Sequence, residues 1–577
     1  MIKLVKQHLK GITLLLALLA PMLMFLEVCM DLQQPTLMAD IVNNGVANGD
    51  MQYVLSTGVR MIIYAAIGFV GGAGCCTLAC YTSVNMGGVI RSKLYAKIQT
   101  LSFAELDEIK TASLITRMTN DVSQVQQMFM MLLRGMTRSP LMFIGCIIMS
   151  FLLSPKLAVI FCVILPVLAT LIILVITKTI PLYGKMQTNI DSVNTVMREN
   201  LLGVRVVKAF TMENRQFDRF SDVNDSLVGV SVKAQSMTFL LMPVSALIMN
   251  LSIVAILWFG GNMEISGILE TGKIMAFVNY MIQITNSLVM LVNMMVNISR
   301  AQVSARRITE VFEKEPSVTG PASPQTPQSF DIEFRNVSFR YGTGEYVLRD
   351  VSFSLGQGRK VGVIGTTGCG KSTLVSLIPR LYDASEGCVL IGGLDVRDIP
   401  LPLLRSEVGI VLQDSQLFSG SIAENMRYGG LGAGDNDILD ALSSADASEF
   451  VLRLPDSLDA RVEQRGRNFS GGQKQRLNIA RTLLQKPKIL ILDDATSAVD
   501  LATDARIQTA VRTSMVDSTI ILIAQRISTV IDCDIILVLD QDGRLSSAGN
   551  HRHLLDTCDL YRSLALSQLG EEVLSIA

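Results

Sequence analysis

Residues 360–373 read KVGVIGTTGCGKST: a strand-like apolar run is followed by a glycine-rich turn ending in Lys-Ser-Thr. This spacing fits the phosphate-binding loop pattern in full. Glycines let backbone N–H groups curl around phosphates, and a helix N-terminus adds a favourable field. Lys371 is expected to reach the outer phosphates, and the Ser372 hydroxyl to take Mg²⁺. The predicted loop comprises Gly365, Thr366, Thr367, Gly368, Cys369, Gly370, Lys371, Ser372 and Thr373. A turn that serves packing alone is the alternative, which the strand before and the helix after disfavour.

A second apolar run, residues 489–492, ends at Asp493-Asp494. A carboxylate there, beside the phosphate loop, can hold magnesium, so Asp493 is assigned the metal role. By itself, a strand ending in a solvated Asp pair would be ordinary. Around these motifs, strand-like runs alternate with helical stretches, which predicts an α/β domain with a largely parallel sheet over residues 331–577. The expected strands are residues 360–364, 409–412, 489–492, 520–523 and 535–539.

The rest of the chain is too apolar for a soluble enzyme. Of 577 residues, 49% are hydrophobic and 18% charged, and 50 basic side chains balance 51 acidic ones, which excludes a nucleic-acid binder. Residues 1–300 carry 22 basic and 16 acidic side chains. Six apolar segments are long enough to cross a bilayer as helices, which predicts an all-α transmembrane domain. They lie near residues 11–34, 54–82, 139–155, 157–177, 238–262 and 274–297.

Basic residues predict the orientation of these helices. Seven lie between Arg91 and Arg138 and eight between Lys178 and Lys233, whereas the opposite connections hold three in all. Both termini and the α/β domain are therefore expected to be cytoplasmic, with the chain multi-pass in the plasma membrane and in contact with its lipid. The proline-rich run EKEPSVTGPASPQTPQSF cannot build a core. It places the boundaries at 1–305 for the transmembrane domain, 306–330 for a linker and 331–577 for the α/β domain.

Polar residues within the spans mark a candidate substrate path. On helix six, spacings of three and four place one set on one face: Asn279, Gln283, Asn286, Met290, Asn293 and Asn297. This face is interpreted as a polar, Met-lined wall of a pathway; the alternative is amide contacts between packed helices. Glu27 and Asp31 lie one turn apart in helix one, where ionised groups are costly. Glu27 is a candidate contact for a cationic substrate or a proton, and Asp31 could instead lie at the outer boundary.

The run Phe469-Ser470-Gly471-Gly472-Gln473-Lys474-Gln475-Arg476, placed before the Asp493 strand, resembles the signature of ATP-binding cassette (ABC) transporters. Six helices before one nucleotide-binding domain resemble a half-transporter of the exporter type, over essentially the whole chain. The resemblance implies ATP and Mg²⁺ as cofactors, Tyr341 stacked on adenine, Gln413 as the glutamine that touches magnesium, and residues 497–500 as a loop at the dimer interface. It also implies that the turns near residues 110–113 and 210–212 are coupling helices.

Two positions depart from the family pattern. Asp494 stands where active members have a Glu that polarises the attacking water, and Gln525 stands at the switch His; the chain's three histidines lie elsewhere. Aspartate is one methylene shorter, and glutamine carries no charge to relay a proton. ATP is therefore expected to bind this site and turn over slowly.

The signature residues Ser470, Gly471, Gly472 and Gln473 are intact, and only the leading Leu is replaced, by Phe469. In this family each ATP lies between one subunit's phosphate loop and the other subunit's signature. The sequence therefore predicts a heterodimer with a second ABC half-transporter that supplies the Glu and His, and a function in exporting amphipathic small molecules of the multidrug type. The alternatives are a lipid or peptide exporter, a homodimeric slow ATPase exporter, and a regulatory ATP-binding subunit without a transport path.

Overall fold

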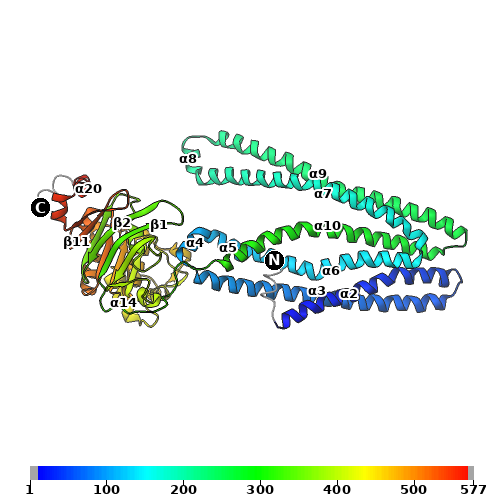
Figure 1. Ribbon diagram of the computed structural model, residues 1–577, viewed down its shortest axis with the longest axis horizontal. Coiled ribbons are helices and arrows are strands. Elements are labelled where there is room, and N and C mark those ends of the chain that lie inside the picture. The colour runs from blue at the N-terminus through cyan, green and yellow to red at the C-terminus, as the bar shows by residue number, and fades with distance from the viewer. Residues whose placement is uncertain (1–10, 570–577) are drawn as a thin grey trace. The chain divides into compact units, whose positions relative to one another are not determined.

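The computed structural model describes residues 11–569, without the side chains at positions 172, 292, 293, 295, 296, 299 and 501. The chain divides into two compact units (Figure 1). The first comprises the chain up to Ile98 together with Ala112–Glu313, and the second comprises Gln99–Thr111 and the chain from Lys314 onwards. The short segment Gln99–Thr111 therefore packs with the C-terminal unit, although the residues before and after it in the sequence belong to the helical unit.

The first unit consists of long helices (Figure 1). Their bounds are α2 Ile12–Asp40, η1 Ile41–Val46, α3 Met51–Thr100, α5 Thr111–Thr116, η2 Arg117–Asp121, α6 Val122–Leu153, α7 Pro155–Leu202, α8 Val204–Ala209, α9 Glu213–Ile265 and α10 Thr271–Glu313. Six described segments are long and apolar enough to cross a membrane, as the sequence predicts. Large apolar side chains such as Phe69, Leu152 and Trp258 are more than two-thirds exposed, as expected of surfaces that face lipid.

Helix α2 packs closely against α3 because glycines replace side chains at the contact. A Cβ on Gly71 would lie 2.9 Å from the Leu23 carbonyl oxygen. Between α2 and α10, the fully buried Tyr280 donates its hydroxyl to the Leu32 carbonyl oxygen at 2.8 Å. Such small residues and interhelical hydrogen bonds hold helices together where lipid supplies no hydrophobic driving force.

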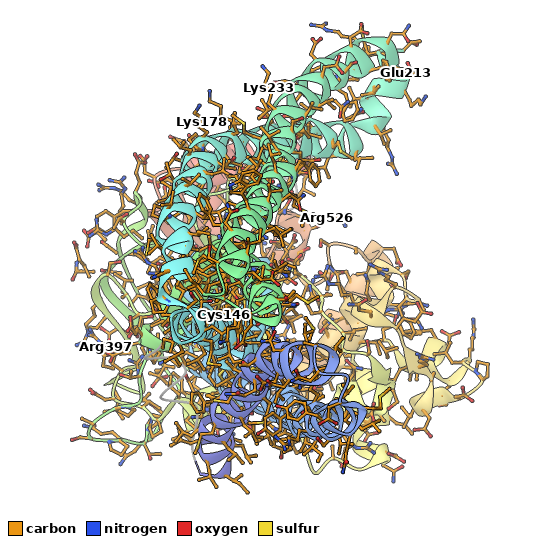
Figure 2. All side chains as sticks on the ribbon, turned by 90° about the vertical axis from the view of Figure 1, so that its right-hand side faces the viewer. Cys146, Lys178, Glu213, Lys233, Arg397 and Arg526 are labelled. Carbon is orange, nitrogen blue, oxygen red and sulfur yellow. The ribbon has the colours of Figure 1, made fainter. Side chains whose placement is uncertain are left out.

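Helices α7 and α9 form an elongated pair. Their side chains bond along its length, with Asn189 donating to the Ser226 hydroxyl at 3.1 Å. Figure 2 shows Lys178 and Lys233 along this pair, with Glu213 near its tip. The short helix α8 joins them, and a turn with positive φ at Thr211 follows.

The second unit is the α/β domain, together with helix α4 Phe103–Ile109. Its strands are β1 Ile332–Arg340, β2 Tyr346–Leu355, β3 Lys360–Gly365, β4 Glu386–Ile391, β5 Leu394–Asp395, β6 Val408–Val411, β7 Gly420–Ser421, β8 Arg461–Val462, β9 Ile489–Asp493, β10 Thr519–Ile523, β11 Ile535–Leu539 and β12 Leu545–Gly549. The helices are α11 Lys371–Ser376, α12 Leu401–Glu407, α13 Ile422–Arg427, α14 Asp435–Ser444, α15 Ser448–Leu452, α16 Gly471–Leu484, α17 Leu501–Ser514, α18 Ile527–Val530, α19 His551–Thr557 and α20 Asp559–Leu569, with turns η3 Ser457–Asp459 and η4 Gln464–Gly466.

Six strands form the main sheet in the order β12-β11-β3-β10-β9-β6, and all neighbours except β11 and β12 run parallel. The five predicted strands are its parallel members, which confirms the fold class. A second, antiparallel sheet has the order β2-β1-β4-β5. Its strands were not predicted, although β1 buries Ile332, Phe334 and Val337 completely or nearly so.

Helix α4 is fixed to the α/β domain by side-chain bonds. Glu105 is 5% exposed; its carboxylate accepts from the backbone N–H of Ser102 at 2.9 Å and of Ser317 at 3.2 Å. Lys314 pairs with Glu108 at 2.6 Å. The chain turns at Lys110, where φ is 67°, within the loop that the sequence assigns to coupling. This loop therefore belongs structurally to the nucleotide-binding unit.

Candidate nucleotide-binding and membrane sites

The glycine-rich loop lies between β3 and α11. Gly368 and Gly370 have φ values of 87° and 94°, a region that only glycine enters without strain. A Cβ on Gly370 would also lie 3.0 Å from the Val347 carbonyl oxygen. Backbone geometry therefore requires glycine in this turn. The Lys371 ammonium donates to the carbonyl oxygens of Gly365 and Thr366, both at 2.9 Å, so it lies over the loop.

Ser372 and Asp493 bring two oxygen ligands together at the end of the central strands. The Ser372 hydroxyl donates to Asp493 Oδ1 at 2.9 Å. Asp493 is only 4% exposed, and burial raises the pKa of its carboxyl group. A bound cation would offset that cost, and hydroxyl and carboxylate oxygens are ligands that Mg²⁺ accepts. The donor set therefore fits magnesium.

Asp494 lies between two amides. Its Oδ2 accepts from Gln525 Nε2 at 3.1 Å and from Gln413 Nε2 at 3.4 Å. The sheet order explains the meeting: these residues follow β9, β10 and β6, and β9 lies between the other two. The carboxyl ends of parallel strands share one edge, so their following side chains converge. Burial raises the pKa of the Asp494 carboxyl group.

These groups surround one cavity of about 340 Å³. Its lining residues are Tyr341, Val347, Thr367, Gly368, Gly370, Lys371, Ser372, Thr373, Gln413, Asp493, Asp494, Ile523 and Gln525. Phosphate-binding loop, carboxylates and switch position are thus gathered in a single place. The volume falls in the range of small-molecule sites.

Tyr341 follows β1 at the rim of this cavity and is 44% exposed, so part of its ring is open to a ligand. Its hydroxyl lies 3.0 Å from the Thr373 hydroxyl. The ring meets the Tyr382 ring edge-on with centroids 5.4 Å apart, and the Tyr382 hydroxyl donates to Asp107 of α4 at 2.5 Å. The sequence pattern did not point to Tyr382, whose run SLIPRLYDASEG reads only as the end of a helix.

Ser470 caps the N-terminus of α16. Its hydroxyl accepts from the Gln473 N–H at 3.3 Å, and the Gln473 side chain accepts from the Ser470 N–H at 2.9 Å. Ser470 and Gly471 are exposed. A Cβ on Gly472 would lie 3.0 Å from the Ala498 carbonyl oxygen, so a close backbone approach explains this glycine. The exposed helix terminus can accept an anionic group from outside the chain.

In the helical unit, part of the polar face of α10 lines a cavity. The cavity has a volume of about 380 Å³ and is lined by Asp31, Gln34, Arg138, Ser139, Met142, Gln283, Asn286, Ser287 and Met290. Asn279 instead bonds the Met275 carbonyl oxygen of its own helix at 3.1 Å. Asn297 is described but does not line this cavity, and the side chain of Asn293 lies outside the described part. The predicted face is therefore divided between cavity wall and helix contacts.

Glu27 and Asp31 are both paired with Arg138 of α6. Arg138 Nε lies 3.2 Å from Glu27 Oε1, and its NH2 group lies 2.9 Å from Asp31 Oδ2. The sequence interpretation placed Arg138 in the connection before helix three and left Glu27 without a partner. In the structure α6 begins at Val122, so Arg138 is helical and lies within the candidate membrane-spanning segment Thr111–Leu153. The signal was available: two carboxylates one turn apart in an apolar helix require a cation.

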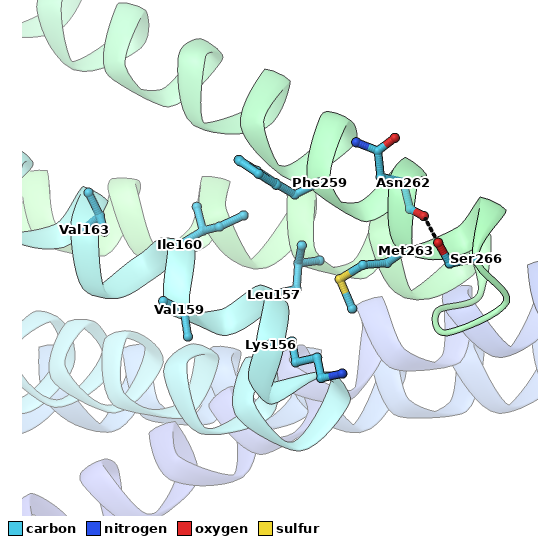
Figure 3. Close-up of a pocket in the computed structure, with 9 residues that line it drawn as sticks. All are labelled: Lys156, Leu157, Val159, Ile160, Val163, Phe259, Asn262, Met263 and Ser266. Carbon is cyan, nitrogen blue, oxygen red and sulfur yellow. Dashed lines mark hydrogen bonds between the residues drawn. The ribbon is translucent and has the colours of Figure 1, made fainter.

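A second cavity of the helical unit lies between α7 and α9 (Figure 3) and has a volume of about 470 Å³. Its lining consists of Lys156, Leu157, Val159, Ile160, Val163, Phe259, Asn262, Met263 and Ser266. The Ser266 hydroxyl donates to the Asn262 carbonyl oxygen at 2.8 Å. Its lining is largely apolar, and it contains none of the residues that the sequence marks as a substrate path.

Six membrane-capable helices joined to a phosphate-loop α/β domain define a multi-pass membrane protein that uses ATP. Residues 17–288 match the family model of the ABC transporter transmembrane region, and residues 348–497 match that of the ABC transporter. The chain belongs to the ABC transporter family, as an exporter half-transporter with a fused membrane domain and an ATPase coupled to transport.

Relatives agree over most of the length. An uncharacterized ABC transporter ATP-binding protein, YfiB of Bacillus subtilis (strain 168), is 39% identical over 559 residues, which cover 97% of each chain. A fatty acid ABC transporter ATP-binding/permease protein of Mycobacterium bovis is 35% identical over 474 residues, 82% of this chain and 75% of that protein. The structure of a bacterial Atm1-family ABC exporter with ATP bound is similar to this chain, with a TM-score of 0.78 and 27% sequence identity. The matched region covers 97% of this chain and 98% of the exporter chain.

Proposed function

We propose that this chain is one half of a heterodimeric exporter of amphipathic small molecules. Its own ATP site hydrolyses slowly, and its signature serves a faster site on the partner. The observation that carries the proposal is the Asp494–Gln525 contact at 3.1 Å, in a chain whose signature residues are intact. The partner subunit supplies the glutamate and histidine that this chain lacks.

The roles of the site residues follow from their positions around the cavity. Lys371 and the loop N–H groups bind the outer phosphates, and Tyr341 offers its exposed ring to the adenine. Ser372, Asp493 and Gln413 hold Mg²⁺, which neutralises charge on the phosphates when bound. These are the functions that the donor types and the local geometry support.

Slow hydrolysis follows from the reach and the partners of Asp494. A shorter side chain places its carboxylate about 1.5 Å further from the water that a glutamate would address. Two amides already donate to the same oxygen, Oδ2. Gln525 can orient a phosphate oxygen by donation, but it offers no imidazole charge for the transferred phosphoryl group.

A working signature is supported by the local packing. Phe469, which replaces the usual leucine, is 7% exposed and contacts Phe450 with ring centroids 6.4 Å apart. The Phe469 side chain is therefore packed inside the domain, and the substitution does not alter the exposed signature residues. The Ser470 hydroxyl and the first N–H groups of α16 remain at the surface, where they can reach the γ-phosphate of an ATP molecule bound to the partner's phosphate loop.

The basic connections support an orientation with the ATP-binding domain and both termini in the cytoplasm, and the protein in the plasma membrane. A lipid exporter is the second candidate, since the Mycobacterium bovis relative is described as a fatty acid transporter. Transport of a labelled fatty acid into inverted vesicles, compared with transport of an amphipathic dye, separates the two substrate classes.

Two variants of the full-length protein in the assembled transporter test the division of labour. Asp494→Asn should leave transport within about twofold of the wild type, because the fast site lies on the partner. Ser470→Ala should reduce transport at least tenfold, since the signature serves that fast site. Symmetric dimers of this chain alone, with brisk ATP turnover that Asp494→Asn abolishes, would show that the proposed asymmetry does not exist.

A further inference from the structure

The cavity between α2, α6 and α10 combines charge, amides and apolar surface in the membrane unit. Its charged lining residues are Asp31 and Arg138, which are 34% and 39% exposed at their side chains. Gln283 and Asn286 contribute amides, and Met142 and Met290 contribute thioethers. An ionised pair that faces a cavity inside a membrane span is costly to keep, so a binding role is the natural explanation.

The charges of the two lining residues Asp31 and Arg138 cancel, and Glu27, which lies outside the lining, adds a second carboxylate that contacts Arg138. Arg138 divides its single positive charge between two carboxylates, those of Glu27 and Asp31. Only Oδ2 of Asp31 is engaged, and within the described part of the chain no side chain or N–H donates to Oδ1. Arg134, one turn before Arg138, is exposed and does not line the cavity. Asp31 Oδ1 therefore remains as an acceptor for a cation.

The position of Glu27 is enforced by packing. A Cβ on Gly72 would lie 2.6 Å from Glu27 Oε2, so glycine at this position of α3 leaves the room that the carboxylate occupies. Glu27 itself does not line the cavity. Its carboxylate pairs with Arg138 on the side away from the cavity. Because Arg138 shares its charge with Glu27, it neutralises Asp31 less completely.

Two serine residues in the wall, each more than nine-tenths buried, are the second sign of a polar ligand. Ser139 is 3% exposed and Ser287 is 8% exposed, and both line the cavity. Neither has a hydrogen-bond partner among the described residues. Polar side chains this deeply buried normally find a partner, so the cavity is suited to a molecule that supplies one.

We propose that this cavity binds the head of an amphiphilic organic cation, with Asp31 as its counter-ion and the serine hydroxyls and amides as orienting contacts. The volume of about 380 Å³ holds an aromatic or alkylammonium head. The thioethers supply adaptable apolar contacts for differently shaped ligands. This inference rests on the proposed export of amphipathic small molecules and names the charge class of the substrate.

Direct binding to the full-length transporter in lipid nanodiscs without ATP tests the assignment. Ethidium is the cationic probe, Nile red the uncharged one and carboxyfluorescein the anionic one, each followed by fluorescence anisotropy. Asp31→Asn should raise the Kd of ethidium about tenfold or more, because a charge-assisted contact is lost, and leave the Kd of Nile red within about twofold. Asp31→Glu, which keeps the charge, should retain most of the affinity.

Glu270→Gln is the matched control, since it removes a carboxylate of the same unit that does not line the cavity. It should leave the ethidium Kd unchanged. If Asp31→Asn does not fold, Glu27→Gln decides, because it frees Arg138 to neutralise Asp31 fully and should weaken ethidium binding. An unchanged ethidium Kd in the folded Asp31 or Glu27 variant overturns the proposal. So does tighter binding of carboxyfluorescein than of ethidium that disappears in Arg138→Gln.

Transport measured in parallel separates this inference from the proposed function. If the wild-type transporter binds ethidium through Asp31 but moves no amphipathic probe in proteoliposomes, the proposed function fails and the binding site stands. If the wild type transports ethidium and Asp31→Asn transports it equally well, the binding site is wrong and the proposed function stands.

Discussion

Restoring the missing methylene at Asp494 should accelerate hydrolysis at this chain's own site. Asp494→Glu extends the carboxylate by about 1.5 Å, the length of one carbon–carbon bond. Misplacement of a reacting group by about 1 Å is worth about a hundredfold in rate. The longer side chain also leaves the position where Oδ2 accepts from Gln525 at 3.1 Å. We expect the hydrolysis rate at this site to rise about a hundredfold.

Single-turnover hydrolysis, with the assembled transporter in excess over radiolabelled ATP and the partner's faster site disabled by Ser470→Ala in every variant, measures this rate apart from product release. Asp494→Asn is the matched control, because it has the size of aspartate without its charge, and it should stay at the slow wild-type rate. Adding Gln525→His to Asp494→Glu should increase the rate further, since an imidazole can share the charge on the γ-phosphate. Lys371→Ala in the same background should abolish the gain by weakening ATP binding.

The refuting result is a wild-type site that already hydrolyses ATP quickly and loses that rate in Asp494→Asn. It would mean that the aspartate reaches the attacking water despite its length. An Asp494→Glu variant that binds ATP normally but gains no rate would also contradict the argument, because reach would then not limit the reaction.

Three further predictions concern stability. Burial lowers the pKa of His551 in the folded protein, so the unfolded chain binds the proton more readily. The melting temperature of the ATP-binding domain should therefore fall as the pH drops below about 6.5, and His551 should not affect it at higher pH. A folded protein whose melting temperature is flat from pH 7.5 to 5.5 would contradict this. Glu105→Ala leaves the Ser317 N–H without its acceptor and should increase hydrogen exchange in α4 at least tenfold, with Ala104→Gln, at an exposed position of the same helix, as control. Tyr280→Phe removes the hydroxyl that bonds α2 and should destabilise the helical unit by about 1 kcal/mol in chemical unfolding; no change would show that the bond is dispensable.

The aromatic contacts beside Tyr341 show how α4 and the nucleotide cavity share side chains within one unit. Tyr382 touches the Tyr341 ring and donates to Asp107, while Phe103 of α4 lies 6.1 Å from Tyr382 between ring centroids. If Tyr341 stacks on adenine as proposed, only one side chain, that of Tyr382, separates the stacked ring from α4. Nothing in the local sequence around Tyr382 indicates this contact.

Local patterns were sufficient where the structure is local. The glycine-rich turn and the five apolar strands each depend on residues a few positions apart, so periodicity and backbone preference identify them. The antiparallel sheet was missed because irregularities interrupt the alternation of its strands: the register shifts between Phe334 and Val337 and again between Val337 and Phe339 of β1. Even the convergence of Asp494 with Gln413 and Gln525 followed only once the strand order was known.

The sequence by itself determined a membrane domain of six apolar helices and a phosphate-binding α/β domain, and its resemblance to the family predicted two substituted positions, Asp494 and Gln525, in the ATP site. Only the tertiary structure decided that Arg138 lies between Glu27 and Asp31, and which part of the polar face of α10 borders a cavity. The physical reason is that apolar content and backbone preference are properties of a segment. The partner of a charge is a property of how segments more than a hundred positions apart pack together.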